Sequence, residues 1–255
     1  MRTIVITNQK GGIGKTTTAL ALAALLQKDG HRTLLIDADP QGNATDTYGA
    51  QVHKQETLYD VLLDASPCAI ADAVQHTDLG DIVASDPLLR KADEVLAGEI
   101  NGMYRLSEAL EGLSATYDYV VIDTAPAINM LLYNCLIAAD DVVVPVAADR
   151  YSITGLSQLH EVIQAIRKRQ KPSLRLAGLL LLKYSGRTNL SKDARSVLES
   201  TAHKLGTKLF ETGVRECVRC QEAQAAKQSL FQYAPLCTTA LDYQSFYHEF
   251  LTEAK

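Results

Sequence analysis

This sequence of 255 residues has few aromatic residues and no tryptophan. Aromatic side chains make up 6% of it, whereas hydrophobic residues as a whole make up 47%. No uninterrupted apolar run approaches the roughly 20 residues that a membrane-spanning helix needs. The sequence therefore argues against a transmembrane protein and favours an α/β domain whose parallel sheet is packed with aliphatic side chains.

The sequence also lacks the signs of a secreted protein. Its five cysteines are an odd number scattered along the chain, which fits reduced thiols better than a disulfide framework. The N-terminal stretch MRTIVITN has the character of a β-strand rather than of a signal peptide. We therefore expect a cytoplasmic protein.

Acidic and basic residues are distributed unevenly. Residues 1–149 carry a net charge of −12, residues 150–227 carry +9 and residues 228–255 carry −2. A basic segment within an acidic protein points to a local patch for a polyanion such as nucleic acid. The alternative interpretation is that these lysines and arginines lie on solvated helix faces.

Strand and helix patterns alternate along the chain. Apolar β-rich runs are expected at residues 3–7, 33–37, 119–123, 142–146 and 176–182. Helical patterns are expected at residues 15–29, 57–64, 104–115, 128–139, 153–170 and 189–205. This alternation predicts a single α/β domain over residues 1–255, with a twisted, mostly parallel sheet and helices on both faces. Ligands of such a fold bind beyond the carboxyl ends of the strands.

The segment NQKGGIGKTT at residues 8–17 follows the first expected strand and opens the first expected helix. Its glycines allow backbone N–H groups to point at phosphate oxygens, and the helix N-terminus adds a positive dipole. Lys15 is placed to reach the β- and γ-phosphates of a nucleotide, and the Thr16 hydroxyl is placed to bind Mg²⁺. Unlike the usual loop, G-x-x-x-x-G-K-[ST], the segment has Gln9 at the first glycine and an additional lysine, Lys10.

Carboxylates follow two of the other expected strands. Asp37 and Asp39 end the run LLIDAD, and Asp123 ends the run YVVID. A carboxylate in this position can hold hydrated Mg²⁺ near the phosphates. Each acid could instead cap the next helix, but three acids beside a phosphate loop favour a nucleoside triphosphatase.

The motifs KGGIGKTTT, LLIDADPQGNAT and YVVIDTAPA resemble the deviant Walker motifs of the ParA/Soj/MinD ATPases. The resemblance to the smaller ParA and Soj partition proteins covers most of the chain, including DIVASDPLLRKADEVLA at 81–97 and YSGRTNLSKDA at 184–194. It implies a P-loop ATPase that uses ATP and Mg²⁺. The residues that would bind the nucleotide are Lys10, Gly11, Gly12, Ile13, Gly14, Lys15, Thr16 and Thr17.

The resemblance also implies roles for single residues. In this family the lysine that matches Lys10 reaches across a nucleotide-sandwich homodimer to the partner's ATP, which makes physical sense for a reaction that develops negative charge. Asp39 would orient the attacking water, and Gly11 would lie where the two backbones approach. The expected catalytic residues are Lys10, Lys15 and Asp39. The residues that would serve the Mg²⁺ are Thr16, Asp39 and Asp123.

In this family the ATP-bound dimer binds double-stranded DNA without sequence preference, which would explain the basic segment. The family loop I-P-R-x-V-R-L-x-E-A matches GVRECVRCQEA at 213–223 and implies phosphate contacts by Arg215 and Arg219. Arg187 and Lys192 are further candidates. A ParB-like adaptor would stimulate hydrolysis, and the ATP state would associate with the nucleoid to partition plasmids, chromosomes or mobile elements.

The same loop departs from the family pattern. Gly213 and Val214 replace the Ile-Pro pair, and Cys217 and Cys220 form a C-x-x-C pair. One alternative function is therefore an iron–sulfur or metal carrier in which a dimer supplies two cysteines from each subunit. Another is an ATPase that positions a protein machine. The C-terminal segment has a helical pattern but is acidic, unlike the basic membrane-binding helix of MinD proteins, so we expect no membrane partner.

Overall fold

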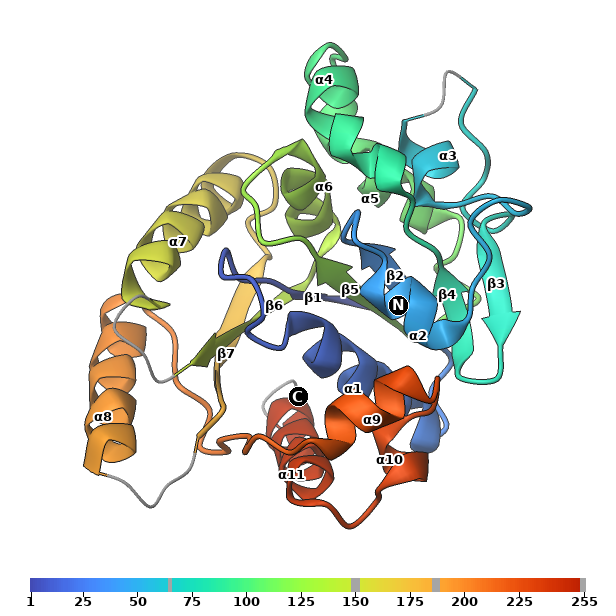
Figure 1. Ribbon diagram of the computed structural model, residues 1–255. Helices are drawn as coiled ribbons and strands as arrows, with labels where there is room; N and C mark the ends of the chain where they lie inside the picture. The colour runs from blue at the N-terminus through green and yellow to red at the C-terminus, as the bar shows by residue number, and fades with distance from the viewer. Residues whose placement is uncertain (64–65, 148–151, 185–188, 253–255) are drawn as a thin grey trace.

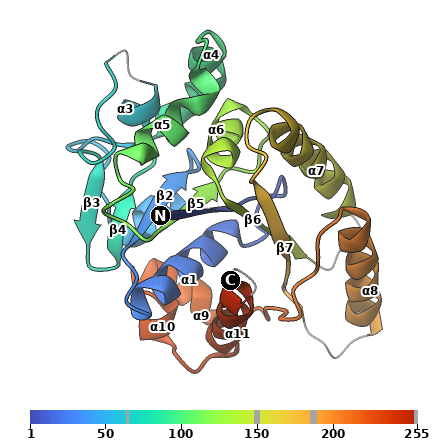
Figure 2. The same cartoon turned by 180° about the vertical axis from the view of Figure 1, so that it is seen from behind.

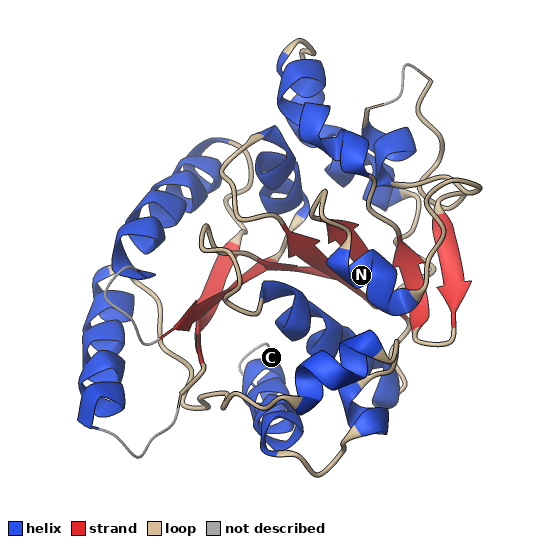
Figure 3. Cartoon of the chain, viewed as in Figure 1, coloured by secondary structure: helices blue, strands red, loops and turns tan. Residues whose placement is uncertain are grey.

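A twisted seven-stranded β-sheet runs through the centre of the molecule in the order β3-β4-β2-β5-β1-β6-β7 (Figures 1 and 3). The computed structural model describes residues 1–63, 66–147, 152–184 and 189–252. The strands are β1 (Arg2–Ile6), β2 (Thr33–Ala38), β3 (Val74–Thr77), β4 (Gly80–Val83), β5 (Tyr119–Thr124), β6 (Asp141–Ala147) and β7 (Arg175–Leu182). The pairs are parallel, apart from the antiparallel hairpin of β3 and β4 at one edge.

Strand register places the ends of β1, β2 and β5 side by side. Asp123 of β5 pairs with Ile6 of β1 on one side and with Asp37 of β2 on the other. Because side chains alternate along a strand, Asp37 projects from the same face as Leu35, and Asp123 from the same face as Val121. Leu35 and Val121 belong to one apolar cluster, so both carboxylates lie on that cluster's face of the sheet.

Helices cover both faces of the sheet (Figures 1 and 2). The helices against the face that carries Asp37 and Asp123 are α1 (Lys15–Lys28), α2 (Asn43–Tyr48) and α11 (Thr238–Thr252), with α9 (Arg219–Ala225) and α10 (Leu230–Tyr233) beside them. The helices against the other face are α3 (Leu58–Leu62), α4 (Ala92–Ala97), α5 (Arg105–Glu111), α6 (Met130–Ala138), α7 (Ser152–Arg169) and α8 (Asn189–Lys204). Two 3₁₀ turns, η1 (Pro87–Lys91) and η2 (Gly102–Tyr104), flank α4. None of the helices, over the described residues, is long and apolar enough to cross a membrane.

The core is aliphatic, as the composition predicts. Every residue of β2 and β6 is buried, and most of these residues are aliphatic. Most of the buried aromatic side chains belong to α11 or pack against it, and the rings of Phe210 and Phe246 meet there edge to face with their centroids 4.9 Å apart.

The expected fold is confirmed, with differences at its edges. The five expected strands correspond to β1, β2, β5, β6 and β7, and their ends differ by no more than one residue. The sequence pattern does not indicate β3 and β4, because each is only four residues long and β3 is largely polar. It also does not indicate α2, α4, α9 or α10, none of which exceeds seven residues, too short for a readable apolar stripe.

The close approach of η2 to the end of α4 generates a stability prediction. A Cβ atom on Gly102 would meet the Leu96 carbonyl oxygen at 2.0 Å, and backbone atoms cannot move aside cheaply. Gly102→Ala should therefore lower the free energy of unfolding by about 1–3 kcal/mol, measured by urea denaturation. Gly98→Ala is the matched control, since its Cβ would be 3.6 Å from the nearest carbonyl oxygen. Equal denaturation midpoints for the two variants would contradict the prediction.

Candidate functional site

The loop between β1 and α1 has the backbone conformation of a phosphate-binding loop. Gly12 has φ +66° and Gly14 has φ +102°, a region that side chains other than glycine rarely adopt. At Gly14 a Cβ atom would also meet Leu182 Cδ1 at 2.8 Å, so this position needs glycine for two reasons. α1 begins directly after it, at Lys15, and turns its free N–H groups toward the loop.

Side chains tie this loop to the neighbouring elements. Asn8 Nδ2 donates a hydrogen bond to the Pro145 carbonyl oxygen at 2.6 Å, and Asn8 Oδ1 accepts one from the Lys10 N–H at 3.0 Å. Gln9, which stands where the usual pattern has glycine, donates from Nε2 to the Gly155 carbonyl oxygen of α7 at 3.2 Å. The substituted position therefore links the loop to α7.

Lys15 is buried at the base of the loop. Its Nζ donates to the Lys10 carbonyl oxygen at 3.2 Å, so the side chain folds back along the loop. Burial lowers the pKa of Lys15, while the charges of Asp123 and Asp39 raise it. The carboxylates of β2 and β5 and the lysine of the phosphate loop thus belong to one electrostatic site, as the sequence predicts.

The acids at the ends of β2 and β5 differ in their partners. Asp37 Oδ2 accepts hydrogen bonds from the Thr45 N–H and hydroxyl, both at 2.8 Å, and Asp37 Oδ1 accepts one from the Asp39 N–H at 3.1 Å. Burial raises the pKa of Asp37 to about 6, against the effect of these hydrogen bonds. Asp39 is less deeply buried, and its Oδ1 accepts a hydrogen bond from the Gln41 N–H at 2.9 Å.

Asp123 is the exception among these acids. It is fully buried, and neither of its carboxylate oxygens makes a hydrogen bond within the described part of the chain. Burial and then the charge of Asp37 raise the pKa of Asp123 well above its usual value, while the nearby Thr16 hydroxyl and Lys15 lower it. A buried anion without partners is costly, so this carboxylate suits a cation brought in by a ligand.

The donor set fits a hydrated magnesium ion better than a dehydrated metal. Among the described residues no three His, Cys, Asp or Glu side chains converge as metal ligands. Mg²⁺ keeps several water molecules and is commonly held by one or two protein oxygens together with phosphates. Thr16, with Asp123 beside it, could serve such an ion, and Thr16 and Asp39 both line the pocket over the phosphate loop.

An open pocket of about 570 Å³ lies over the phosphate loop. One wall is the loop itself, from Gly11 to Thr17, and another is the start of α2 with Asp39. The remaining wall comes from the C-terminal part of the chain, namely residues 214–217, α9 and the start of α11. The pocket therefore joins the two ends of the sequence, and it is large enough for a nucleotide.

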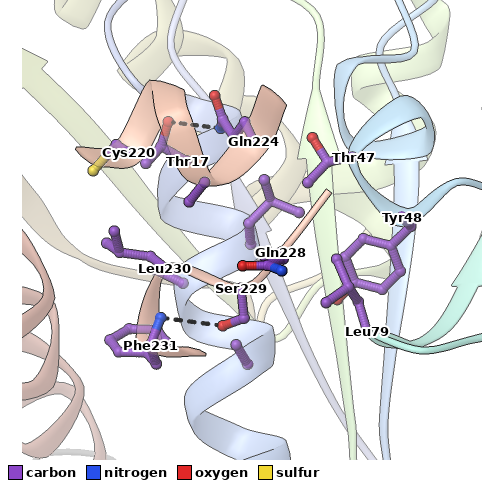
Figure 4. Close-up of a pocket in the computed structure, with 14 residues that line it drawn as sticks. Thr17, Thr47, Tyr48, Leu79, Cys220, Gln224, Gln228, Ser229, Leu230 and Phe231 are labelled. Atoms are coloured by element: carbon purple, nitrogen blue, oxygen red, sulfur yellow. Dashed lines mark hydrogen bonds between the residues drawn. The ribbon is translucent and has the colours of Figure 1, made fainter. Parts of the chain in front are cut away.

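A second, narrow apolar pocket lies beside the first, between α1 and the segment of α9 and α10 (Figure 4). The figure shows the Gln224 amide donating to the Thr17 hydroxyl, at 3.3 Å. Thr17 follows directly after the expected Mg²⁺ residue, so α9 is attached to the nucleotide-binding helix at that point. Lys227, two residues after the end of α9, makes an ion pair with Asp46 of α2 at 3.0 Å.

Of the residues expected to contact DNA, the structure describes the side chains of Arg215 and Arg219, and each of them is paired with an acid. Arg215 makes a two-bonded ion pair with Asp242 of α11 and lines the large pocket, and Arg219 pairs with Glu222 within α9. Arg187 lies outside the described residues. Lys192 is in α8, but its side chain is not described.

The helices of the basic segment, residues 150–227, lie in two places. α7 and α8 lie outside the β7 edge of the sheet, whereas α9 lies near α1 and α2 (Figure 1) and lines the large pocket. Arg175 pairs with Asp141, and Lys171 pairs with Asp140, so part of the positive charge is neutralised by acids from β6 and the residue before it. Arg167, Lys168 and Arg169, in the last turn of α7, are consecutive and exposed, and they form a cationic cluster that the sequence analysis counts only within the basic segment.

The C-x-x-C pair lies in the wall of the large pocket. The Cys220 N–H donates to the Cys217 carbonyl oxygen at 3.2 Å, so the two residues form one turn. Burial raises the pKa of Cys220 to about 11, which leaves its thiol protonated at neutral pH. The metal-carrier alternative requires a second cysteine pair from another subunit, so it stays a prediction.

The phosphate loop, the buried lysine and the strand-end acids define a nucleoside-triphosphate-binding domain of the P-loop class. A sequence model described as an AAA domain matches residues 1–176. The chromosome partitioning protein ParA of Caulobacter vibrioides (strain NA1000 / CB15N) is 35% identical over 260 residues, which cover 100% of this chain and 96% of that protein. The chain therefore belongs to the ParA/Soj family of P-loop ATPases.

Solved structures agree with this assignment. The complex of Cyanothece McdA(D38A) with ATP superposes with a TM-score of 0.87 at 28% identity, covering 99% of this chain and 96% of that chain. Cobyrinic acid a,c-diamide synthase of Mycobacterium smegmatis, with a bound ATP analogue and magnesium, superposes with a TM-score of 0.85 at 28% identity, covering 100% of this chain and 96% of that chain. Both similarities extend over nearly the whole chain.

The raised pKa of Asp123 generates a prediction about stability and pH. Between the ordinary carboxyl pKa of 3.8 and the raised value, the folded protein holds a proton that the unfolded chain releases. Raising the pH through this range therefore destabilises the nucleotide-free protein, and Asp123→Asn removes this effect. Without Mg²⁺, the Tm of the wild type should fall relative to that of Asp123→Asn as the pH is raised from about 4 toward neutral. A difference that does not change with pH would contradict the prediction.

Proposed function

We propose that this protein is an ATP-driven switch of the partition type, which dimerises on ATP, binds DNA in that state and releases it after hydrolysis. The proposal rests on the buried ion set at the strand ends, where Lys15 folds along the phosphate loop and Asp123 has no hydrogen-bond partner among the described residues. An anion at Lys15 and a hydrated cation at Asp123 would complement each other, and a magnesium–nucleotide complex supplies both.

Residues of this chain would carry the separate parts of hydrolysis. The loop N–H groups and Lys15 would hold the β- and γ-phosphates, and Thr16 with Asp123 would hold the hydrated Mg²⁺, which neutralises charge on the transferred phosphoryl group. Asp39 would orient the attacking water at the pocket rim. Because buried hydrogen bonds hold the loop and the backbone of Asp39, these groups would be positioned before the substrate arrives.

Lys10 would act across a dimer. Its backbone is held on both sides, since its N–H donates to Asn8 Oδ1 and its carbonyl oxygen accepts from Lys15 Nζ. A second subunit packed face to face would receive the Lys10 cation at its own ATP, so neither site would be complete in a monomer. ATP binding and dimerisation would then favour each other by linkage.

DNA binding would follow from dimerisation. The candidate cations are Arg215 and Arg219 beside the pocket, Arg187 and Lys192 in the segment 184–194, and the α7 cluster of Arg167, Lys168 and Arg169. Contacts to phosphates require only positive charge on one surface and read no base sequence. A ParB-like adaptor bound at a centromere-like site would stimulate hydrolysis and return the protein to its free state, so that cargo follows the nucleoid-bound form.

The central test is binding to random-sequence duplex DNA with ATP, with ADP and without nucleotide, at several salt concentrations. Salt-sensitive binding is expected only with ATP. The double variants Arg215→Ala/Arg219→Ala and Arg167→Ala/Arg169→Ala should be compared, because each phosphate contact that is lost lowers the slope of log affinity against log salt by about 1. An absence of binding in every nucleotide state would refute the DNA part of the proposal.

The dimer part of the proposal is tested separately by light scattering. Lys10→Ala should lose ATP-dependent dimerisation because the cation contributed across the interface is missing. Gly11→Val should do the same by steric exclusion, although a Cβ atom on Gly11 would meet no atom within 4 Å inside one subunit. Both variants should therefore keep the thermal stability of the wild-type monomer. A normal ATP-dependent dimer in either variant would count against this interface.

A further inference from the structure

A closed ring of hydrogen bonds joins β2, the segment after it, α2 and Ser85, which is the second residue after β4. Asp37 Oδ2 accepts from the Thr45 hydroxyl at 2.8 Å, and the Thr45 hydroxyl oxygen accepts from the Ser85 N–H at 2.8 Å. The Ser85 hydroxyl donates to the Asp39 carbonyl oxygen at 2.6 Å, and the Asp39 N–H donates to Asp37 Oδ1 at 3.1 Å. The ring therefore returns to the residue at which it begins.

The ring is almost completely shielded from water. The exposed fractions are 0% for Asp37, 4% for Thr45, 2% for Ser85 and 7% for Asp39. In such surroundings a hydrogen bond is electrostatically stronger than in water, and an unpaired group is costly. Each member of the ring is therefore confined to the geometry in which its partners are satisfied.

The ring holds the peptide groups on both sides of Asp39. Its N–H is held by Asp37, and its carbonyl oxygen is held by Ser85 and by the Gly42 N–H at 2.8 Å. Asp39 lies just beyond β2, where the chain leaves the sheet and turns through Gly42, which has φ +67°. Asp39 lies outside β2, so no strand pairing fixes its backbone, and these hydrogen bonds hold it instead. Because the backbone of Asp39 sets the direction of its side chain, the ring also sets that direction.

We propose that Ser85 and Thr45 are positioning residues that aim the Asp39 carboxylate at the attacking water. This inference rests on the role proposed above for Asp39. The proposal gives a function to Ser85, the serine of the segment DIVASDPLLRKADEVLA. Ser85 does not line the large pocket. Ser85 acts through a backbone carbonyl and Thr45 acts through Ser85, so neither needs to touch the nucleotide.

A purely structural role gives different expectations. Asp37 also caps the first turn of α2 through the Thr45 N–H, and loss of that cap would weaken the whole pocket wall. A structural role therefore predicts that ATP affinity and hydrolysis fall together. The positioning role predicts slower hydrolysis with ATP affinity and ATP-dependent dimerisation unchanged, because Asp39 would contribute only to the chemical step.

Ser85→Ala is the first test, since it removes the hydroxyl and keeps the N–H that Thr45 accepts. Hydrolysis at saturating ATP should fall at least ~10-fold, because displacements of about 1 Å in an active site reduce rates by up to ~100-fold. The Kd for ATP should stay within about twofold of the wild type. The matched control is Ser107→Ala in α5, whose hydroxyl also donates to a carbonyl oxygen at 2.8 Å and which should hydrolyse ATP normally.

The double variant Asp39→Ala/Ser85→Ala shows whether Ser85 acts through Asp39. If it does, the double variant should hydrolyse ATP at the rate of Asp39→Ala alone, because a residue that has been removed cannot be aimed. Multiplied effects in the double variant would overturn the proposal. So would a wild-type rate in Ser85→Ala, or a loss of ATP affinity as large as the loss of rate.

Two variants of Thr45 keep the proposal testable if Ser85→Ala does not fold. Thr45→Ser retains the hydroxyl and should keep most of the rate, whereas Thr45→Val removes it with little change of shape and should lose at least ~10-fold. Equal rates in these two variants would overturn the proposal. A wild-type rate in Asp39→Ala would instead show that the role assigned to Asp39 is wrong, so the two failures are distinguishable.

Discussion

Two buried carboxylates on adjacent parallel strands, Asp37 and Asp123, are the constraint on which the site depends. Their paired register on one face of the sheet brings two fully buried carboxyl groups together, where ionisation of both is costly. Three features favour the ionised form of these carboxylates: the positive end of α1, the buried Lys15 and the first turn of α2. The strand register therefore decides where every other part of the site lies.

The two carboxylates differ in their hydrogen bonds, and therefore in what they can do. Thr45 and the Asp39 N–H satisfy Asp37, so this acid serves the protein and holds the segment that follows β2. Asp123 has no hydrogen bond among the described residues, so in the proposed function a cation that arrives with the nucleotide would stabilise it. The occupied form would then be more stable than the empty form, which is the energetic difference that the proposed switch uses.

The sequence predicts those parts of the molecule whose signal lies within one short segment. Aliphatic runs locate five strands, and the glycine pattern with Lys15 locates the phosphate loop. The role of Ser85 cannot be seen in this way, since its partner Asp39 is distant along the chain. The same limit applies to the basic segment: the sequence shows its charge, but only the fold shows that Arg215 faces Asp242 and that the helices of the segment lie in two places.

The large pocket has walls from both ends of the chain, with Gly11 to Thr17 on one side and residues 214–243 on the other. This affects the order of events during synthesis. A nascent chain has made its phosphate loop early, but the opposite wall and the contacts of the segment of α9 and α10 with Thr17 and Asp46 exist only after nearly the whole chain has left the ribosome. Unfinished chains therefore lack a complete nucleotide site, and nucleotide binding distinguishes completed molecules from truncated ones.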